Sequence, residues 1–118
     1  MKIAFLLTLL LAAPLAAANF SGTWTLDGDV AGNPVKGSCV LKQDGAKISG
    51  VCKLEGKADA EAKGEVTEDK VVFQHEVEHN GTVYVLEYTG KKASETELKG
   101  DINVRSEGVT GYFTAKKN

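Results

Sequence analysis

The segment His75-Glu76-Val77-Glu78-His79 has the residue types and spacing that most directly suggest chemistry. Two histidines four positions apart, with a glutamate after the first, form the zinc-binding motif of metallopeptidases when they share one face of a helix. Here the segment follows Val71-Val72-Phe73 and runs into Asn80-Gly81, which predicts a strand that enters a hairpin. On a strand the two histidine backbones lie roughly 13 Å apart, too far to share one ion. We therefore predict no metal site and no cofactor at this motif.

His75 is predicted to lie near two tyrosines if the hairpin turns at Asn80-Gly81. That register places His75 opposite Leu86 and diagonally close to Tyr84 and Tyr88. One interpretation is a core histidine that hydrogen-bonds a tyrosine hydroxyl, because buried polar groups need partners. The other is a polar anchor in an apolar ligand pocket. The residues predicted to line such a pocket are Trp24, Phe73, His75, Tyr84 and Tyr88.

Cys39 and Cys52 are the two cysteines of the chain, and their spacing predicts a disulfide. With a turn over 44–47, residues 39 and 52 face each other on neighbouring strands, and both fall in the inward phase. A redox or metal pair would be expected to show a C-x-x-C spacing, which this chain lacks. A bridge that closes so short a loop contributes roughly 3 kcal/mol of stability.

The strands that position these residues are predicted from a repeated pattern, in which apolar residues stand two positions before and two positions after a glycine. It first appears as Phe20-Ser21-Gly22-Thr23-Trp24 and returns around glycines 37, 50, 64, 100 and 111. Period-2 alternation marks strands with one buried face, and each of these glycines falls on that face. Inward glycines mark tight bends or close backbone approaches, as expected of a small, sharply coiled barrel. Tyr88-Thr89-Gly90 supplies half a copy of the pattern, and the glycines at 28, 32, 45, 56, 81 and 108 are expected at or beside turns.

Eight strands are predicted, which gives an all-β fold: an eight-stranded antiparallel up-and-down β-barrel, a meander. A β-sandwich is the alternative architecture, and a short helix over 58–63 is the alternative for the fourth strand. Glu107-Gly108 joins the last two strands, with Val104 expected opposite Gly111. The predicted strands cover residues 22–30, 35–43, 47–55, 59–67, 70–79, 82–91, 97–105 and 109–116.

The N-terminal residues 1–18 are predicted to be a signal peptide. Lys2 is followed by an apolar run over 3–11 and by an Ala16-Ala17-Ala18 cleavage site. The run is too short to span a bilayer, so we expect no membrane span. The remaining 19–118 form one small domain with 13 basic and 16 acidic residues, which argues against nucleic acid as a partner. We expect an exported monomer, periplasmic or extracellular.

The run Ser21-Gly22-Thr23-Trp24 resembles the Gly-x-Trp first strand of lipocalins and related calycins. Lipocalins cover this tryptophan with an arginine of the last strand, and no arginine occupies that strand here. Residues 22–116 are similar to short exported bacterial lipocalin-like barrels. The similar runs include Leu41-Lys42-Gln43-Asp44-Gly45, Lys70-Val71-Val72-Phe73, Tyr88-Thr89-Gly90, Leu98-Lys99-Gly100 and Phe113-Thr114-Ala115-Lys116. The resemblance implies a lipocalin-like barrel with Trp24 at its closed end, and it implies no particular activity.

Three classes of function are compatible with this sequence, and a small enzyme is the least favoured of them. The first is the binding of a small apolar ligand inside the barrel. The alternative is a protein-binding module, since the chain also resembles secreted bacterial metallopeptidase inhibitors, short disulfide-bonded barrels with a Ser-Gly-x-Trp opening. No Ser-His-Asp set or carboxylate pair can be assembled from the predicted strands, so we predict that the protein is not an enzyme.

Overall fold

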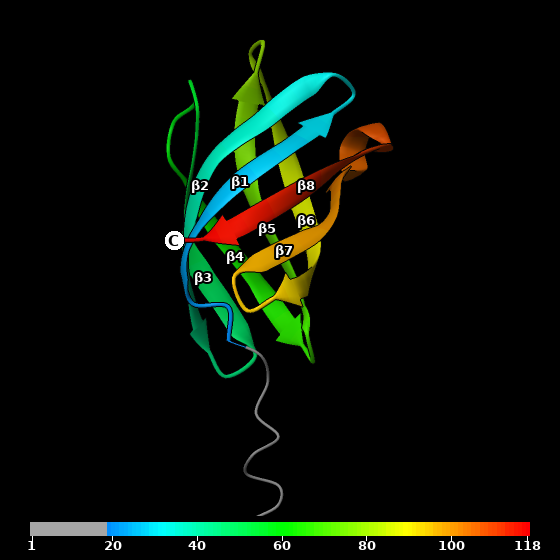
Figure 1. The fold of residues 1–118 in the computed structure, drawn as a ribbon. Helices are drawn as coiled ribbons and strands as arrows, with labels where there is room; N and C mark the ends of the chain where they lie inside the picture. Colours follow the sequence, from blue (N-terminus) through cyan, green and yellow to red (C-terminus); the bar gives the residue numbers. More distant parts are fainter. Residues whose placement is uncertain (1–18) are drawn as a thin grey trace, which may run out of the picture.

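In the computed structural model, which describes residues 19–118, the chain forms a closed barrel of eight antiparallel strands in sequence order (Figure 1). Strand β1 pairs with both β2 and β8, which joins the two edges that an open meander would expose. The predicted barrel is confirmed, and within the segment 58–63 residues 60–63 belong to strand β4 and none belongs to a helix. The strands are β1 (Gly22–Val30), β2 (Asn33–Asp44), β3 (Lys47–Leu54), β4 (Ala60–Thr67), β5 (Lys70–His79), β6 (Thr82–Ser94), β7 (Glu97–Val104) and β8 (Val109–Lys117).

The proposed signal peptide, residues 1–18, lies outside the described residues. Within 19–118, the structure contains no helix with the length and apolar character needed to cross a membrane.

Strand register agrees with the sequence in the hairpins that carry the candidate site. Phe73 faces Tyr88, and His75 faces Leu86 across the β5–β6 hairpin. Cys39 faces Cys52 across β2–β3. A turn inside a hairpin fixes the pairing of both flanking strands, which is why these registers could be derived from turn residues.

The predicted register of β7 and β8 is wrong by two residues. Gly111 faces Ile102, and Val104 faces Val109 instead of Gly111. The reason is η2 (Arg105–Glu107), a 3₁₀ turn that ends β7 at Val104 and closes with Gly108 in the left-handed conformation, at φ 64°. A slip of two residues keeps each side chain on its own face of the sheet, so the inward residues are unaffected.

Inward glycines let neighbouring strands approach closely. A Cβ atom on Gly100 would overlap the carbonyl oxygen of Thr89 on the adjacent strand. The prediction that Gly28 lies at or beside a turn is wrong, because it lies inside β1 and a Cβ there would overlap the carbonyl oxygen of Tyr112. The other glycines whose Cβ would overlap a neighbouring strand's backbone are Gly37, Gly50, Gly64 and Gly111.

One end of the barrel is closed by the residues that precede β1. Phe20 is completely buried, and its carbonyl oxygen accepts a hydrogen bond from Nε1 of Trp24 at 2.8 Å. Its backbone N–H donates to Oε1 of Gln43 at 2.7 Å, which ties the segment to β2. Nζ of Lys117, on the last strand, lies 5.6 Å from the centroid of the Trp24 ring. The cation beside this tryptophan is therefore a lysine of the last strand.

Candidate functional site

The opposite end of the barrel holds an apolar cavity of about 240 Å³, here called the mouth cavity. It lies where the connections β1–β2, β5–β6 and β7–β8 meet. Its polar lining side chains, Asn33, Lys57, His79 and Glu107, are exposed. Its wall is formed by the inward side chains nearest this end of each strand: Val30, Val35, Leu54, Val77, Tyr84, Leu86, Val104 and Val109.

The five residues predicted to line one ligand pocket lie in different parts of the barrel. Tyr84 is half-buried and lines the mouth cavity. His75 is 3% exposed and lines a second cleft, between β4 and β5, which shares Lys57 and Val77 with the mouth cavity. Trp24, Phe73 and Tyr88 are at most 1% exposed and are packed in the core. The structure thus brings Phe73, His75 and Tyr88 together, while Tyr84 lies at the mouth and Trp24 at the closed end.

Aromatic packing fills the middle of the barrel. The rings of Phe73 and Tyr88 stack with centroids 4.7 Å apart, and Phe113 meets Tyr88 edge-on at 5.2 Å. These are the favourable geometries for aromatic pairs. Because side chains occupy this level, the mouth cavity does not extend down to the closed end.

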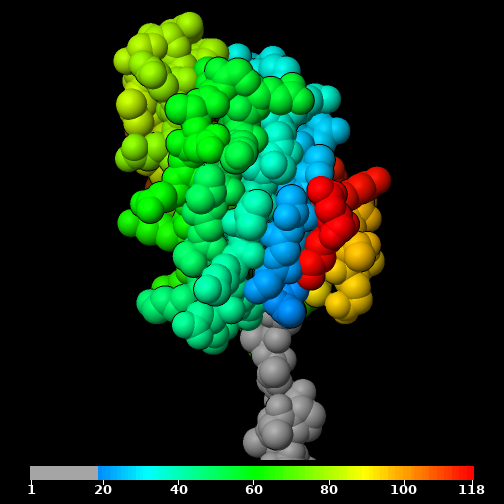
Figure 2. All heavy atoms as spheres, turned by 90° about the vertical axis from the view of Figure 1, so that its left-hand side faces the viewer, coloured from blue at the N-terminus to red at the C-terminus, as the bar shows by residue number. Residues whose placement is uncertain are grey.

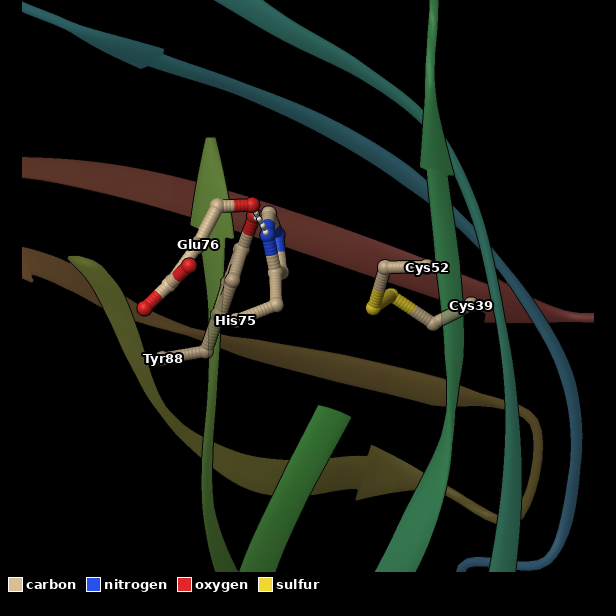
Figure 3. The surroundings of a disulfide bond; sticks show 5 residues. All are labelled: Cys39, Cys52, His75, Glu76 and Tyr88. Carbon is tan, nitrogen blue, oxygen red and sulfur yellow. Dashed lines mark hydrogen bonds between the residues drawn. A yellow bond between two sulfur atoms is a disulfide. The ribbon is translucent and has the colours of Figure 1, made fainter. Parts of the chain in front are cut away.

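His75 and Tyr88 form a hydrogen-bonded pair, as the core interpretation of His75 predicts. Nδ1 of His75 lies 3.0 Å from the carbonyl oxygen of Glu76, so Nδ1 carries the proton and donates it. Nε2 is therefore the acceptor of the Tyr88 hydroxyl, which lies 2.8 Å away (Figure 3). Both ring nitrogens are thus engaged, which leaves the imidazole without a free lone pair to act as a base.

Burial keeps both members of this pair uncharged. Loss of hydration lowers the pKa of His75, and the hydrogen bond to the Glu76 carbonyl offsets only part of that effect. Loss of hydration raises the pKa of Tyr88 well above its usual range. At neutral pH the pair is a structural contact between neutral groups.

The predicted disulfide joins Cys39 and Cys52, whose Cα atoms are 4.0 Å apart. Figure 3 shows it projecting into the barrel interior, as the His75–Tyr88 pair also does from other strands. Both cysteines are at most 1% exposed. The disulfide therefore links β2 covalently to β3 within the core.

The motif His75–His79 belongs to strand β5, as predicted. Its first histidine is buried and its second is exposed. Across residues 19–118, no three or more histidine, cysteine, aspartate or glutamate side chains gather in a way that could hold a metal ion.

Sequence reasoning missed the aliphatic wall of the mouth cavity. None of these aliphatic residues was named as a candidate site residue from the sequence. The signal that identifies them is their place at the last inward position of a strand, as for Val30, Leu54 and Val104. The cleft between β4 and β5 was also missed, although the alanines at 60 and 62 indicate a thin wall there.

The fold and these cavities define a class: closed eight-stranded antiparallel up-and-down barrels. No known family model matches the sequence, and no curated protein matches it. The chain is similar to the solved structure of a redesigned β-barrel, b11L5F_LGL, at 15% identity and a TM-score of 0.65, over 88% of this chain and 96% of that one. It is also similar to a redesigned β-barrel, mFAP1, bound to DFHBI, at 14% identity and a TM-score of 0.61, over 82% of this chain and 94% of that one. At such identities the similarity establishes the fold.

Proposed function

We propose that this protein is an exported, lipocalin-like carrier that binds a small apolar ligand in its mouth cavity and catalyses no reaction. The observation that carries this proposal is the cavity of about 240 Å³ with a wall of aliphatic side chains and Tyr84. Concave, mostly apolar cavities with a few polar groups are the usual sites for small molecules. The mFAP1 barrel, which holds DFHBI, supports the view that a barrel of this fold has room for such a ligand.

The size of the cavity limits the ligand. An apolar cavity of about 150 Å³ binds benzene, whereas drug-sized ligands need about 300 Å³ or more. A ligand for this mouth therefore has one aromatic ring or a short aliphatic chain. Lys57 and His79 lie beside the apolar wall and would face a single polar group of the ligand.

A role in binding agrees with how the polar groups are used. His75, the buried histidine, has both ring nitrogens in hydrogen bonds, so it supports packing rather than proton transfer. Export agrees with the predicted signal peptide and with the disulfide, since such bonds persist in oxidising compartments.

The test is thermal denaturation with small probes, namely indole, p-cresol and hexanoate. A ligand at about 100 times its dissociation constant adds about 2.7 kcal/mol to stability, which raises Tm by about 10 °C or more in a domain this size. Val77→Phe should fill the mouth and abolish the shift. Val40→Phe, on an exposed position of β2, is the matched control and should keep it. Binding at the mouth is excluded if no probe raises Tm or if Val77→Phe responds like the unmodified protein.

A further inference from the structure

The wall between β4 and β5 is open along part of its length. β4 pairs with β3 over Ala60–Glu65 but with β5 only over Lys63–Thr67. β5 pairs with β6 over its full length, Lys70–His79, yet its pairing with β4 ends at Gln74. Residues 60–62 of β4 and 75–79 of β5 therefore face each other across a cleft of about 940 Å³, here called the seam. Figure 2 shows this face, with β4 in green beside the β5–β6 hairpin in yellow-green.

Side chains cap the backbone of β5 along the seam. The carbonyl oxygen of Glu76 accepts from Nδ1 of His75 at 3.0 Å. The carbonyl oxygen of Glu78 accepts from Nζ of Lys57 at 2.8 Å. Carbonyls two residues apart on a strand point to the same side, so both belong to the edge that a neighbouring strand would occupy. Strand edges of this kind are templates for pairing with another chain.

We propose that the seam binds an extended peptide segment of a partner protein, which adds as a strand between β4 and β5. This function goes beyond ligand binding at the mouth, although the seam and the mouth cavity share Lys57 and Val77. The incoming backbone would replace the Lys57 cap on the Glu78 carbonyl and pair with the edge of β4. The inward positions of β4 at the seam are Ala60 and Ala62, which leave room for small apolar side chains of the peptide.

The charges of the seam specify the outward side chains of that peptide. Its ionisable lining comprises the acidic Asp59, Glu61, Glu76 and Glu78 against the basic Lys57 and Lys63, besides His75. Asp59 is paired with Lys53 at 3.7 Å, and Lys57 keeps its charge when it donates to the Glu78 carbonyl. The carboxylates left to a cationic partner are therefore Glu61, Glu76 and Glu78. Opposite charges on neighbouring strands stabilise a sheet. The partner segment therefore alternates lysine or arginine, facing outward, with small apolar residues, facing inward.

The experiment uses the full chain and a fluorescent capped peptide, Lys-Ala-Arg-Val-Lys-Ala-Arg. We expect saturable binding by fluorescence anisotropy, and amide shift changes and slower hydrogen exchange at residues 60–62 and 75–79. Two control peptides separate backbone pairing from charge attraction. N-methylation of alternate residues should reduce affinity at least about tenfold, because it removes the hydrogen bonds that provide affinity in strand addition. Replacing each basic residue by glutamate should also abolish measurable binding.

Protein variants test the same contacts from the other side. Glu76→Gln and Glu78→Gln should each weaken binding about two- to fivefold, whereas Glu68→Gln, in the exposed β4–β5 turn, should not. Lys57→Met should tighten binding, because it frees the Glu78 carbonyl. Tyr84→Ala, in the mouth cavity, should leave peptide affinity unchanged.

Several results would overturn the proposal. These are no binding of the basic peptide, equal binding of its N-methylated form, amide shifts confined to other strands, or weaker binding to Lys57→Met. Self-association of the chain through 60–62 and 75–79, seen by sedimentation and amide shifts, would assign the seam to a second copy and would also exclude the peptide.

Discussion

At the scale of single residues, His75 and Tyr88 show how one buried contact serves two polar groups. Each supplies the hydrogen bond that the other needs in an otherwise apolar interior. The sequence predicted this contact because a turn at Asn80-Gly81 fixes which residues are diagonal neighbours. It could not predict which tyrosine would be the partner, since Tyr84 and Tyr88 are equally close in register.

The pair should give the protein a stability maximum between about pH 6.5, the ordinary pKa of histidine, and about pH 10, that of tyrosine. Below this window, unfolded His75 binds a proton that the folded state resists, so stability falls as the pH falls. Above it, unfolded Tyr88 loses a proton that the folded state retains, so stability falls as the pH rises. Urea denaturation at several pH values measures both limbs. His75→Leu should flatten the acid limb relative to a His79→Gln control, and an unchanged limb would contradict this assignment.

Tyr88→Phe should destabilise the fold by about 1–3 kcal/mol, because Nε2 of His75 is then buried without a partner. The double variant Tyr88→Phe with His75→Leu should recover much of that loss, since replacing both members of a pair by apolar groups leaves no unsatisfied atom. Urea denaturation of the two single variants and the double variant gives the coupling energy. Additive effects would show that the hydrogen bond contributes nothing.

At the scale of elements, strand phase and turn residues predicted most of the barrel. The β5–β6 and β2–β3 registers followed from their turns, and the inward phase of each strand followed from alternation. The β7–β8 register did not, because a 3₁₀ turn over Arg105–Glu107 leaves no alternation to read. The position of Gly28 was predicted wrongly for a related reason. Its spacing in the sequence shows that a turn is near, but it does not show that the backbone of the neighbouring strand fills the space beside it.

Gly100 and Gly90 face each other on β7 and β6, so they allow a matched comparison. Gly100→Ala should cost about 1–3 kcal/mol, because its Cβ would meet the backbone of Thr89, which cannot move without distorting β6. Gly90→Ala should cost less, since its Cβ meets only the end of the Phe113 ring, at 3.0 Å. Thermal denaturation ranks the two. The opposite ranking would mean that the backbone of β6 can move aside at lower cost in free energy than the Phe113 ring.

The disulfide is a second element-scale prediction. Thiol labelling of the denatured, unreduced protein should find no free cysteine, and reduction should expose two. Cys39→Ala combined with Cys52→Ala should lower the free energy of unfolding by roughly 3 kcal/mol. Without the bridge the unfolded chain is no longer closed into a loop, so its conformational entropy is higher and unfolding is more favourable. The disulfide is contradicted if both thiols react before reduction.

At the scale of the whole molecule, the barrel has two different ends and an incomplete wall. Phe20 and Trp24 close one end, aliphatic side chains surround an open mouth at the other, and the seam interrupts the wall between β4 and β5. The sequence indicated the closed end through its Gly-x-Trp strand. It could not indicate the seam, because the point at which two paired strands diverge depends on sheet coiling rather than on the local pattern of either strand.

Phe20→Ala should open the closed end while leaving the mouth intact. Phe20 is completely buried at the end of the barrel where its carbonyl oxygen accepts from Trp24, so removing its side chain should cost about 3–5 kcal/mol. Trp24 is the single tryptophan of the chain, so its fluorescence reports on this end alone. In the variant its emission should shift to longer wavelength and become accessible to acrylamide, whereas Phe20→Leu should keep both properties close to those of the unmodified protein. Because aromatic packing around Tyr88 separates the two ends, a ligand that binds at the mouth should still raise the Tm of folded Phe20→Ala. Loss of that response together with Trp24 exposure would mean that the two ends are one continuous cavity.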